Sequence, residues 1–253
     1  MKTLLTNGCS WTYGGGIDRL FKDPSNLVWP HHLKKLMGYD NCVNLSWGGG
    51  SNQRIFRTTL DWILKQTPET LESTTAVIQW TQWSRKEFYL SPDIGDIDDN
   101  EPYYWIACTI HHANATKELN QILLTKDRSV IEDYSNQIKN NHNSLYKSYR
   151  EIEGFYNYIM CCDGLANIFN NYGIKYYYWD FINLEPNLPE PFLSHILNSH
   201  PWLERDTIRH QWDYQRLNQD PGPYGVADDP HPSLLGHKQL AEHIYEAIKH
   251  SEQ

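Results

Sequence analysis

The sequence predicts an α/β protein in which short buried strands alternate with amphipathic helices. Apolar runs of strand length occur at residues 2–6, 42–45, 75–80 and 174–181, and such runs are typical of buried strands. The segments between and after them carry apolar residues every three or four positions, as helices do. With 253 residues the chain can bury a sizeable core, so we expect a single domain over 1–253.

Three helices have clear sequence signals. The first is predicted over 27–37, because Pro30 is favourable in a first turn. The second is predicted over 52–65, where Ser51 is placed to cap the first turn. The last follows a stiff proline-containing loop and covers the amphipathic stretch LLGHKQLAEHIYEAIKH.

Residues 103–172 are predicted to be mainly helical, since Ile152, Tyr156 and Ile159 keep helical spacing. This stretch is longer than one crossover helix requires. We therefore expect an inserted helical pair or cap beside the ligand-binding edge, although ordinary helix packing away from any ligand explains it equally well. The acidic stretch 91–102 lacks calcium-loop spacing and is expected to be a solvated loop.

Ser10 stands directly after the first predicted strand, in the stretch MKTLLTNGCSWTYGGG. A residue at this point sits on a sharp turn at the carboxyl edge of an open α/β sheet, where ligands approach. Nucleophilic serines occupy such turns because the hydroxyl must stand clear of packing and close to a base. Taken alone, a turn with a capping serine explains the same residues.

A second feature lies before the last helix, where Asp228 precedes His231 by three residues. An Asp at this spacing can place its carboxylate on the imidazole Nδ1, which leaves Nε2 free as a base. The two features together, in this order along the chain, resemble the SGNH (GDSL-type) hydrolase family. The sequence GCSWTYG is similar to the first conserved block of that family, with Ser10 as the nucleophile and Cys9 where Asp is usual.

The second block of the family resembles NLSWGGGSN at 44–52. Its spacing puts Gly49 on the glycine that donates to the oxyanion, and a shift of one residue would put Gly48 or Gly50 there. Cys after Gly in the first block, Trp-Pro at 29–30 and this second block are similar to SGNH-like proteins seen in phages and marine bacteria.

The third block is the poorest match, because VIQWTQWS at 77–84 lacks the Gly-x-Asn-Asp of the family. Trp83 falls on the position of the Asn, which supplies an oxyanion hydrogen bond. An indole donates only through Nε1–H and would crowd the pocket. Gln82 is therefore the expected substitute donor, and Thr81 is a weaker candidate. The last block, DDPH at 228–231, matches closely.

The resemblance implies a three-layer α/β/α fold with a flavodoxin-like parallel sheet of four or five strands. It also implies a serine esterase that acts through an acyl-enzyme, with Ser10, His231 and Asp228 as the catalytic triad. The backbone N–H groups of Ser10 and Gly49, with Gln82, are the expected oxyanion donors. The expected substrate is a short-acyl ester, with a carbohydrate O-acetyl ester as the first choice, and no cofactor or metal is expected.

Composition limits the partners. Lys and Arg number 22 against 31 Asp and Glu, a net charge of −9, and no basic run occurs, so nucleic acid and anionic membranes are not expected. No segment reaches 18 consecutive apolar residues, so no membrane span is predicted. Ten Trp and 17 Tyr would suit a site that stacks on sugars, although most of them should be core residues.

The N-terminus lacks a signal-peptide pattern, and five cysteines fit no zinc module. We expect a cytoplasmic protein, or one associated with a virion if a phage encodes it. A catalytic cysteine would have to be Cys9, but Ser10 holds the family position. The alternative from another class is a non-catalytic SGNH-like module that binds glycan or builds a virion. The missing third block favours it, and the retained Ser10, Asp228 and His231 oppose it.

Overall fold

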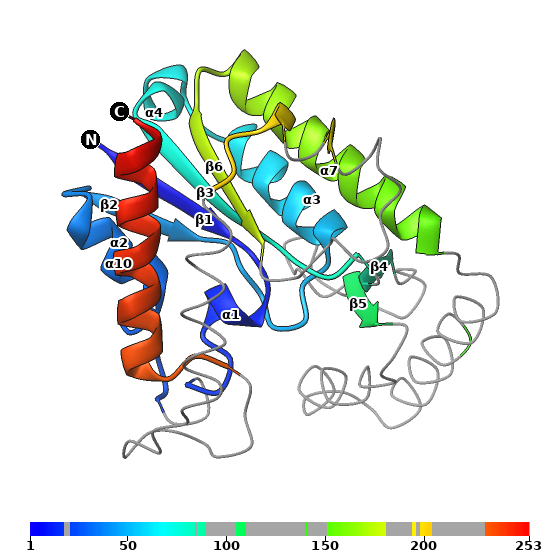
Figure 1. Cartoon of the computed structure of the whole chain (residues 1–253), viewed down its shortest axis with the longest axis horizontal. Helices are drawn as coiled ribbons and strands as arrows, with labels where there is room; N and C mark the ends of the chain where they lie inside the picture. Colours follow the sequence, from blue (N-terminus) through cyan, green and yellow to red (C-terminus); the bar gives the residue numbers. More distant parts are fainter. Residues whose placement is uncertain are drawn as a thin grey trace.

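A parallel sheet with helices on both faces forms the centre of the computed structural model (Figure 1). The structure describes residues 1–17, 21–83, 85–89, 105–109, 140, 151–180, 194–195, 198–203 and 231–252.

Four parallel strands make the sheet: β1 (Thr3–Asn7), β2 (Asn41–Asn44), β3 (Thr74–Trp80) and β6 (Lys175–Asp180). Their spatial order is β2-β1-β3-β6, which is the flavodoxin-like order predicted from the sequence. Every residue of β1 and β3 is buried, because helices cover both faces of these central strands. A single parallel bridge from Tyr178 to Trp202 extends the sheet beside β6.

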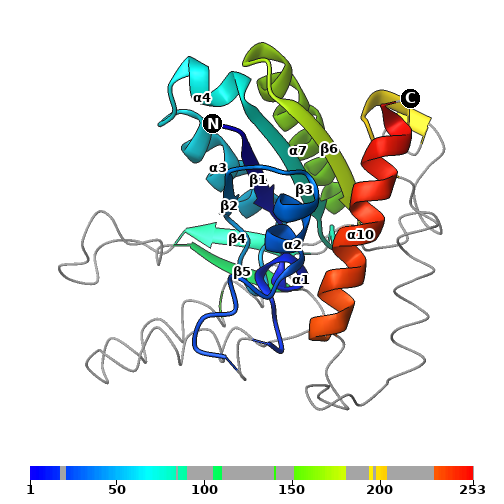
Figure 2. The same ribbon diagram turned by 90° about the vertical axis from the view of Figure 1, so that its left-hand side faces the viewer.

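The helices form two outer layers (Figures 1 and 2). Helices α2 (Trp29–Leu36) and α10 (Leu234–Ser251) lie together on one face, and α3 (Asn52–Ile63) and α7 (Glu151–Asn171) lie together on the other. The predicted helices over 27–37 and 52–65 and before the C-terminus are therefore confirmed, with ends that differ by a few residues. The three-layer α/β/α architecture is confirmed as well.

Each face of the sheet has its own apolar core, in which aromatic rings pack among aliphatic side chains. On the side of α3 and α7, the rings of Trp80 and Tyr178 meet edge to face, with centroids 5.3 Å apart. On the side of α2 and α10, Trp29 and Trp179 meet in the same way at 5.8 Å. Such edge-to-face pairs add stability beyond the area that they bury.

The prediction of helix from residue 103 is wrong at its start. Residues Trp105–Thr109 form strand β5, which pairs antiparallel with β4 (Arg85–Tyr89) beyond the carboxyl edge of the main sheet (Figure 2). The sequence WIACT is rich in strand-favouring residues, and β4 supplies the partner that the sequence pattern did not reveal. Short helix α4 (Pro68–Glu72) was also not predicted.

Helix α7 confirms the helical prediction at the end of the 103–172 stretch, but the expected apolar face is rotated. Tyr156 is 48% exposed, and the buried face runs instead through Phe155, Tyr158, Cys162 and Leu165. Both sets have helical spacing, so only packing against the sheet and α3 decides between them. Most of the proposed insertion and the acidic stretch 91–102 lie outside the described residues.

Candidate active site

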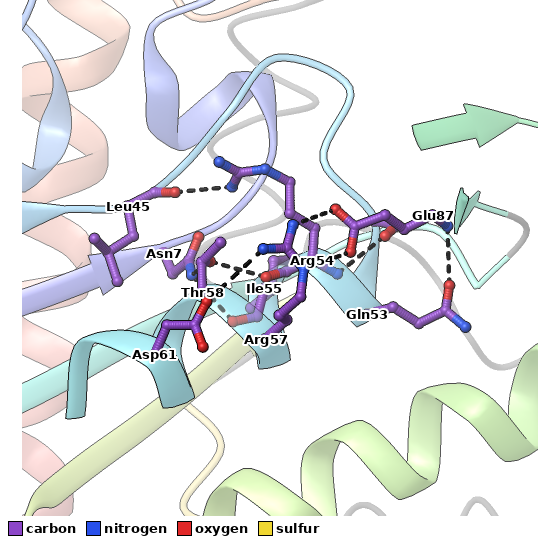
Figure 3. A network of polar contacts seen from close by, with 10 residues as sticks. Asn7, Leu45, Gln53, Arg54, Ile55, Arg57, Thr58, Asp61 and Glu87 are labelled. Carbon is purple, nitrogen blue, oxygen red and sulfur yellow. Dashed lines mark hydrogen bonds and ion pairs between the residues drawn. The ribbon is translucent and has the colours of Figure 1, made fainter. Parts of the chain in front are cut away.

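The end of β1 is fixed by the buried side chain of Asn7 (Figure 3). Its Nδ2 donates to the carbonyl of Ile55 at 3.1 Å and to the hydroxyls of Thr58 and Thr59, each at 2.9 Å. Its Oδ1 accepts from the backbone N–H of Gly8 at 2.8 Å. Because buried polar groups with every bond satisfied define one geometry, Asn7 sets where the chain leaves the sheet.

Ser10 begins the single-turn helix α1 (Ser10–Tyr13) immediately after this anchor. The preceding residue, Cys9, is fully buried, and its Sγ lies 3.7 Å from Gln79 Oε1 on β3. Thr12 donates its hydroxyl to the same oxygen. The thiol therefore packs beneath the turn, whereas Ser10 is only half-buried. This arrangement favours Ser10 over Cys9 as a reactive group.

His231 reaches Ser10 from the opposite end of the chain. Its Nε2 lies 2.7 Å from Ser10 Oγ, across a separation of 221 residues. Ser233 fixes the approach, because its Oγ accepts from Gly236 N at 3.1 Å and caps helix α10. The structure thus brings together the serine and histidine singled out in the sequence.

Gly15 is a site residue that the sequence analysis passed over. A Cβ at this position would lie 2.8 Å from both Nε2 and Cδ2 of His231, and 3.0 Å from the Cβ of Ser10. No side chain fits there without moving the histidine away from the serine. The run of three glycines at 14–16, directly after the Ser10 turn, was the available signal in the sequence.

The second conserved block lies against the Ser10 turn. Trp47 N donates to the carbonyl of Gly8 at 3.3 Å, and Gly50 N donates to the carbonyl of Trp47 at 3.0 Å. Gly49, between them in this turn, has φ 75°, a left-handed conformation that a residue with a side chain rarely adopts. Its assignment as an oxyanion donor stays a prediction.

The second and third blocks are joined by one buried side chain. Asn52 Nδ2 donates to the carbonyl of Thr81 at 3.0 Å, and Asn52 Oδ1 accepts from the N–H of Thr81 at 2.9 Å. Trp83 packs against Phe155 of α7 with ring centroids 4.7 Å apart, so it contributes to the core. Gln82 is half-buried, and its role as a donor stays a prediction.

His237 lies in the interior below His231, on the first turn of α10. It is fully buried, and its Nδ1 accepts from Trp29 N at 3.2 Å. Burial, with smaller repulsion from His32 and His231, lowers the pKa of His237 to about 3. The imidazole is therefore neutral across the physiological range, and it ties α10 to α2 as an acceptor.

Asp228, predicted to bind the second ring nitrogen of His231, lies outside the described residues, and that role stays a prediction.

Within the described ranges, no group of three or more His, Cys, Asp or Glu side chains is arranged to hold a metal ion. In the same part of the chain, no helix combines the length and apolar character needed to cross a membrane.

Comparison with solved structures shows similarity over almost the whole chain. The structure of TesA matches with a TM-score of 0.50 and 14% identity, covering 99% of each chain. The lipase Lip_vut3 from a goat rumen metagenome matches at 0.46 and 12% identity, covering 98% of this chain and 97% of that one. A lipolytic G-D-S-L family member from Veillonella parvula matches at 0.47 and 8% identity, covering 98% and 99%.

The match to TesA supports the fold: the chain has the SGNH-hydrolase-like α/β fold that its sequence predicts. In sequence, residues 18–132 match a family described as a family of unknown function (DUF6071). That match begins after Ser10 and ends before His231. No curated protein matches the chain. The finer resemblance to phage and marine-bacterial proteins stays a prediction.

Proposed function

We propose that the protein is a serine ester hydrolase of SGNH type that works through an acyl-enzyme. The observation that carries this proposal is the 2.7 Å separation between Ser10 Oγ and His231 Nε2. A serine hydroxyl is a weak nucleophile until a neighbouring base accepts its proton. At this distance an unprotonated Nε2 accepts the hydroxyl hydrogen bond and can take the proton as Oγ attacks.

The proposed reaction has two halves. Ser10 Oγ bonds to the ester carbonyl carbon while its proton passes to His231 Nε2. The tetrahedral intermediate then collapses, the carbon–oxygen bond to the alcohol breaks, and the protonated histidine returns the proton to the leaving alcohol. In the second half, His231 takes a proton from water as the water oxygen bonds to the acyl carbon. The bond between that carbon and Ser10 Oγ then breaks, His231 returns the proton to Oγ, and the carboxylic acid leaves. Asp228 would hold the imidazole in the required tautomer.

The oxyanion of each intermediate needs preorganised donors. We assign this role to the backbone N–H groups of Ser10 and Gly49, with Gln82 in place of the missing Asn. The hydrogen bond from Trp47 N to the carbonyl of Gly8 supports the assignment of Gly49, because it holds the glycine turn beside the serine turn. Trp83 packs its ring against Phe155, and Gln82, its neighbour in sequence, is the amide that we propose in its place.

A short-acyl ester of a carbohydrate is the proposed substrate. Trp47 is 43% exposed on the glycine loop, and its ring centroid lies 5.6 Å from that of Tyr13 on α1. Trp47 thus offers exposed aromatic surface on which a sugar ring could stack, and the guanidinium of Arg54 also lies over this ring, with its Cζ 5.7 Å from the centroid. We also propose that the insertion over 103–172 governs the choice of substrate more than the chemistry. A cytoplasmic location, or a virion association for a phage-encoded chain, belongs to the same proposal.

The test is hydrolysis of p-nitrophenyl acetate, together with labelling by a fluorophosphonate probe. The Ser10→Ala variant should lose labelling and at least about a thousandfold in rate, as loss of a nucleophile does. Ser199→Ala is the matched control, because the Ser199 hydroxyl also lies near a histidine nitrogen, 3.3 Å from Nδ1 of His195. The control variant should keep the wild-type rate and labelling.

Equal rates for the wild type and Ser10→Ala would reject the hydrolase proposal. If the wild type were inactive and unlabelled yet still bound sugars, the chain would be a binding module built on this fold. A specific observation favours this second candidate: a half-buried Trp83, packed against the apolar core, stands where the family has its oxyanion-donating Asn.

A further inference from the structure

Arg85 lies at the carboxyl edge of the sheet, where the chain turns from β3 into β4. Its backbone N–H donates to the carbonyl of Gln82 at 3.1 Å, and its Nη1 donates to the carbonyl of Gly50 at 3.3 Å. Gly50 in turn lies against the Ser10 turn, since a Cβ on it would be 3.2 Å from the carbonyl oxygen of Gly8. The guanidinium therefore lies beside the glycine loop of the candidate active site.

The charge of Arg85 is not balanced within the described part of the chain. Its Nε is buried and has no hydrogen-bond acceptor there, and no carboxylate of these residues lies within ion-pair distance. Nearby Arg57 provides the contrast: its Nε and Nη2 bind Glu87 Oε2 and Oε1 at 3.1 and 2.7 Å (Figure 3). Arg85 as a whole is half-buried, but a guanidinium N–H that is shielded from water and has no acceptor is costly, so the surroundings of Arg85 favour an anion.

We infer that Arg85 recognises a carboxylate carried by the ester substrate, an inference that rests on the proposed hydrolase function. The bond to Gly50 uses Nη1, so the Nε and Nη2 edge of the guanidinium has no acceptor among the described residues. This is the edge with which Arg57 grips a carboxylate, and its geometry matches two carboxylate oxygens. Helix α3 begins just after Gly50, and the positive end of its dipole adds to the attraction.

The substrate class that follows is an acyl ester of an acidic sugar. The protein carries a net charge of −9, so its overall field does not draw anions toward the surface. An acidic substrate would depend on a local cation, and Arg85 supplies one at the glycine loop. A neutral sugar ester would fit the same catalytic groups but would leave the guanidinium uncompensated.

The experiment compares two acetylated sugars that differ in one group. Methyl glucoside acetate carries a neutral CH2OH where methyl glucuronoside acetate carries a carboxylate, and acetate release gives kcat and KM for each. The wild type should prefer the acidic ester. In Arg85→Gln the KM for the acidic ester should rise about 10- to 100-fold, the range expected when a charge-assisted hydrogen bond is lost. The kcat values for both esters and the KM for the neutral ester should change little.

Lys86→Gln is the matched control, because it removes a positive charge from the next residue of the same strand, whose partner is Glu153. This variant should keep the wild-type kcat and KM for both esters. Arg85→Lys keeps the charge without the two-pronged geometry, should fall between the wild type and Arg85→Gln, and serves if the Gln variant folds poorly. An equal loss on both esters would show that Arg85 only positions Gly50 and would overturn the inference, as would no change on either.

Activity toward p-nitrophenyl acetate separates the two proposals. If the wild type cleaves that neutral ester but shows no preference for the acidic sugar, the carboxylate inference fails and the hydrolase proposal stands. If no ester is cleaved, calorimetric binding of the two sugars to the wild type and to Arg85→Gln replaces the kinetics. Tighter binding of the acidic sugar that disappears in the variant would then support Arg85, and equal binding would reject it.

Discussion

The buried histidine of helix α10 makes the protein sensitive to mild acid. His237 is fully buried, accepts a hydrogen bond from Trp29 N, and has its pKa lowered from 6.5 to about 3. Between pH 6.5 and about pH 3, the imidazole of His237 is protonated in the unfolded chain but neutral in the native protein. Stability therefore falls as pH falls through 6.5 and continues to fall toward about 3, the native pKa.

The size of the effect follows from linkage. At pH 5 the unfolded imidazole is about 1.5 pH units below its ordinary pKa, which corresponds to about 2 kcal/mol of lost unfolding free energy relative to pH 7.5. The variant His237→Asn keeps an acceptor near the Nδ1 position for Trp29 N but cannot titrate. Its unfolding free energy should therefore change by about 2 kcal/mol less than that of the wild type over this pH range.

Urea denaturation at pH 7.5 and pH 5 measures both quantities. His250→Gln is the matched control, since His250 is exposed near the end of the same helix, and this variant should follow the wild type. The result that would refute the prediction is a pH dependence of His237→Asn within about 0.5 kcal/mol of the wild type. It would mean that the native protein binds the proton at His237 nearly as readily as the unfolded chain does.

Two further predictions concern residues that shape the site. Gly15→Ala should lower esterase activity at least about tenfold while unfolding free energy changes by less than about 1 kcal/mol, since its methyl group would displace His231 by only a small shift; unchanged activity toward p-nitrophenyl acetate would contradict it. Asn7→Ala should lower the unfolding free energy measured by urea denaturation by about 1–3 kcal/mol, because it leaves the buried N–H of Gly8 without an acceptor; a loss below about 0.5 kcal/mol would show that the network is dispensable.

The sequence alone determined the parts of this protein that depend on local pattern. Runs of strand length rich in apolar and aromatic residues predicted β1, β2, β3 and β6, because such residues favour strands that pack in a sheet. Capping and helical spacing located α2, α3 and α10 in the same way. The turn after β1 and the spacing of Asp228 and His231 indicated the serine and the histidine before any distance between them was known.

Tertiary structure decided what depends on partners distant in the chain. Strand β5 forms because β4 lies beside it, and the buried face of α7 excludes Tyr156 because α3 and the sheet meet its other side. The periodicity of the sequence reveals neither feature, because strand pairing and the rotation of a helix are set by contacts with segments far away in sequence. The same holds at the site: the close approach of Gly15 to His231, and the buried Nε of Arg85 that finds no acceptor among the described residues, arise only when separate segments converge at one edge of the sheet.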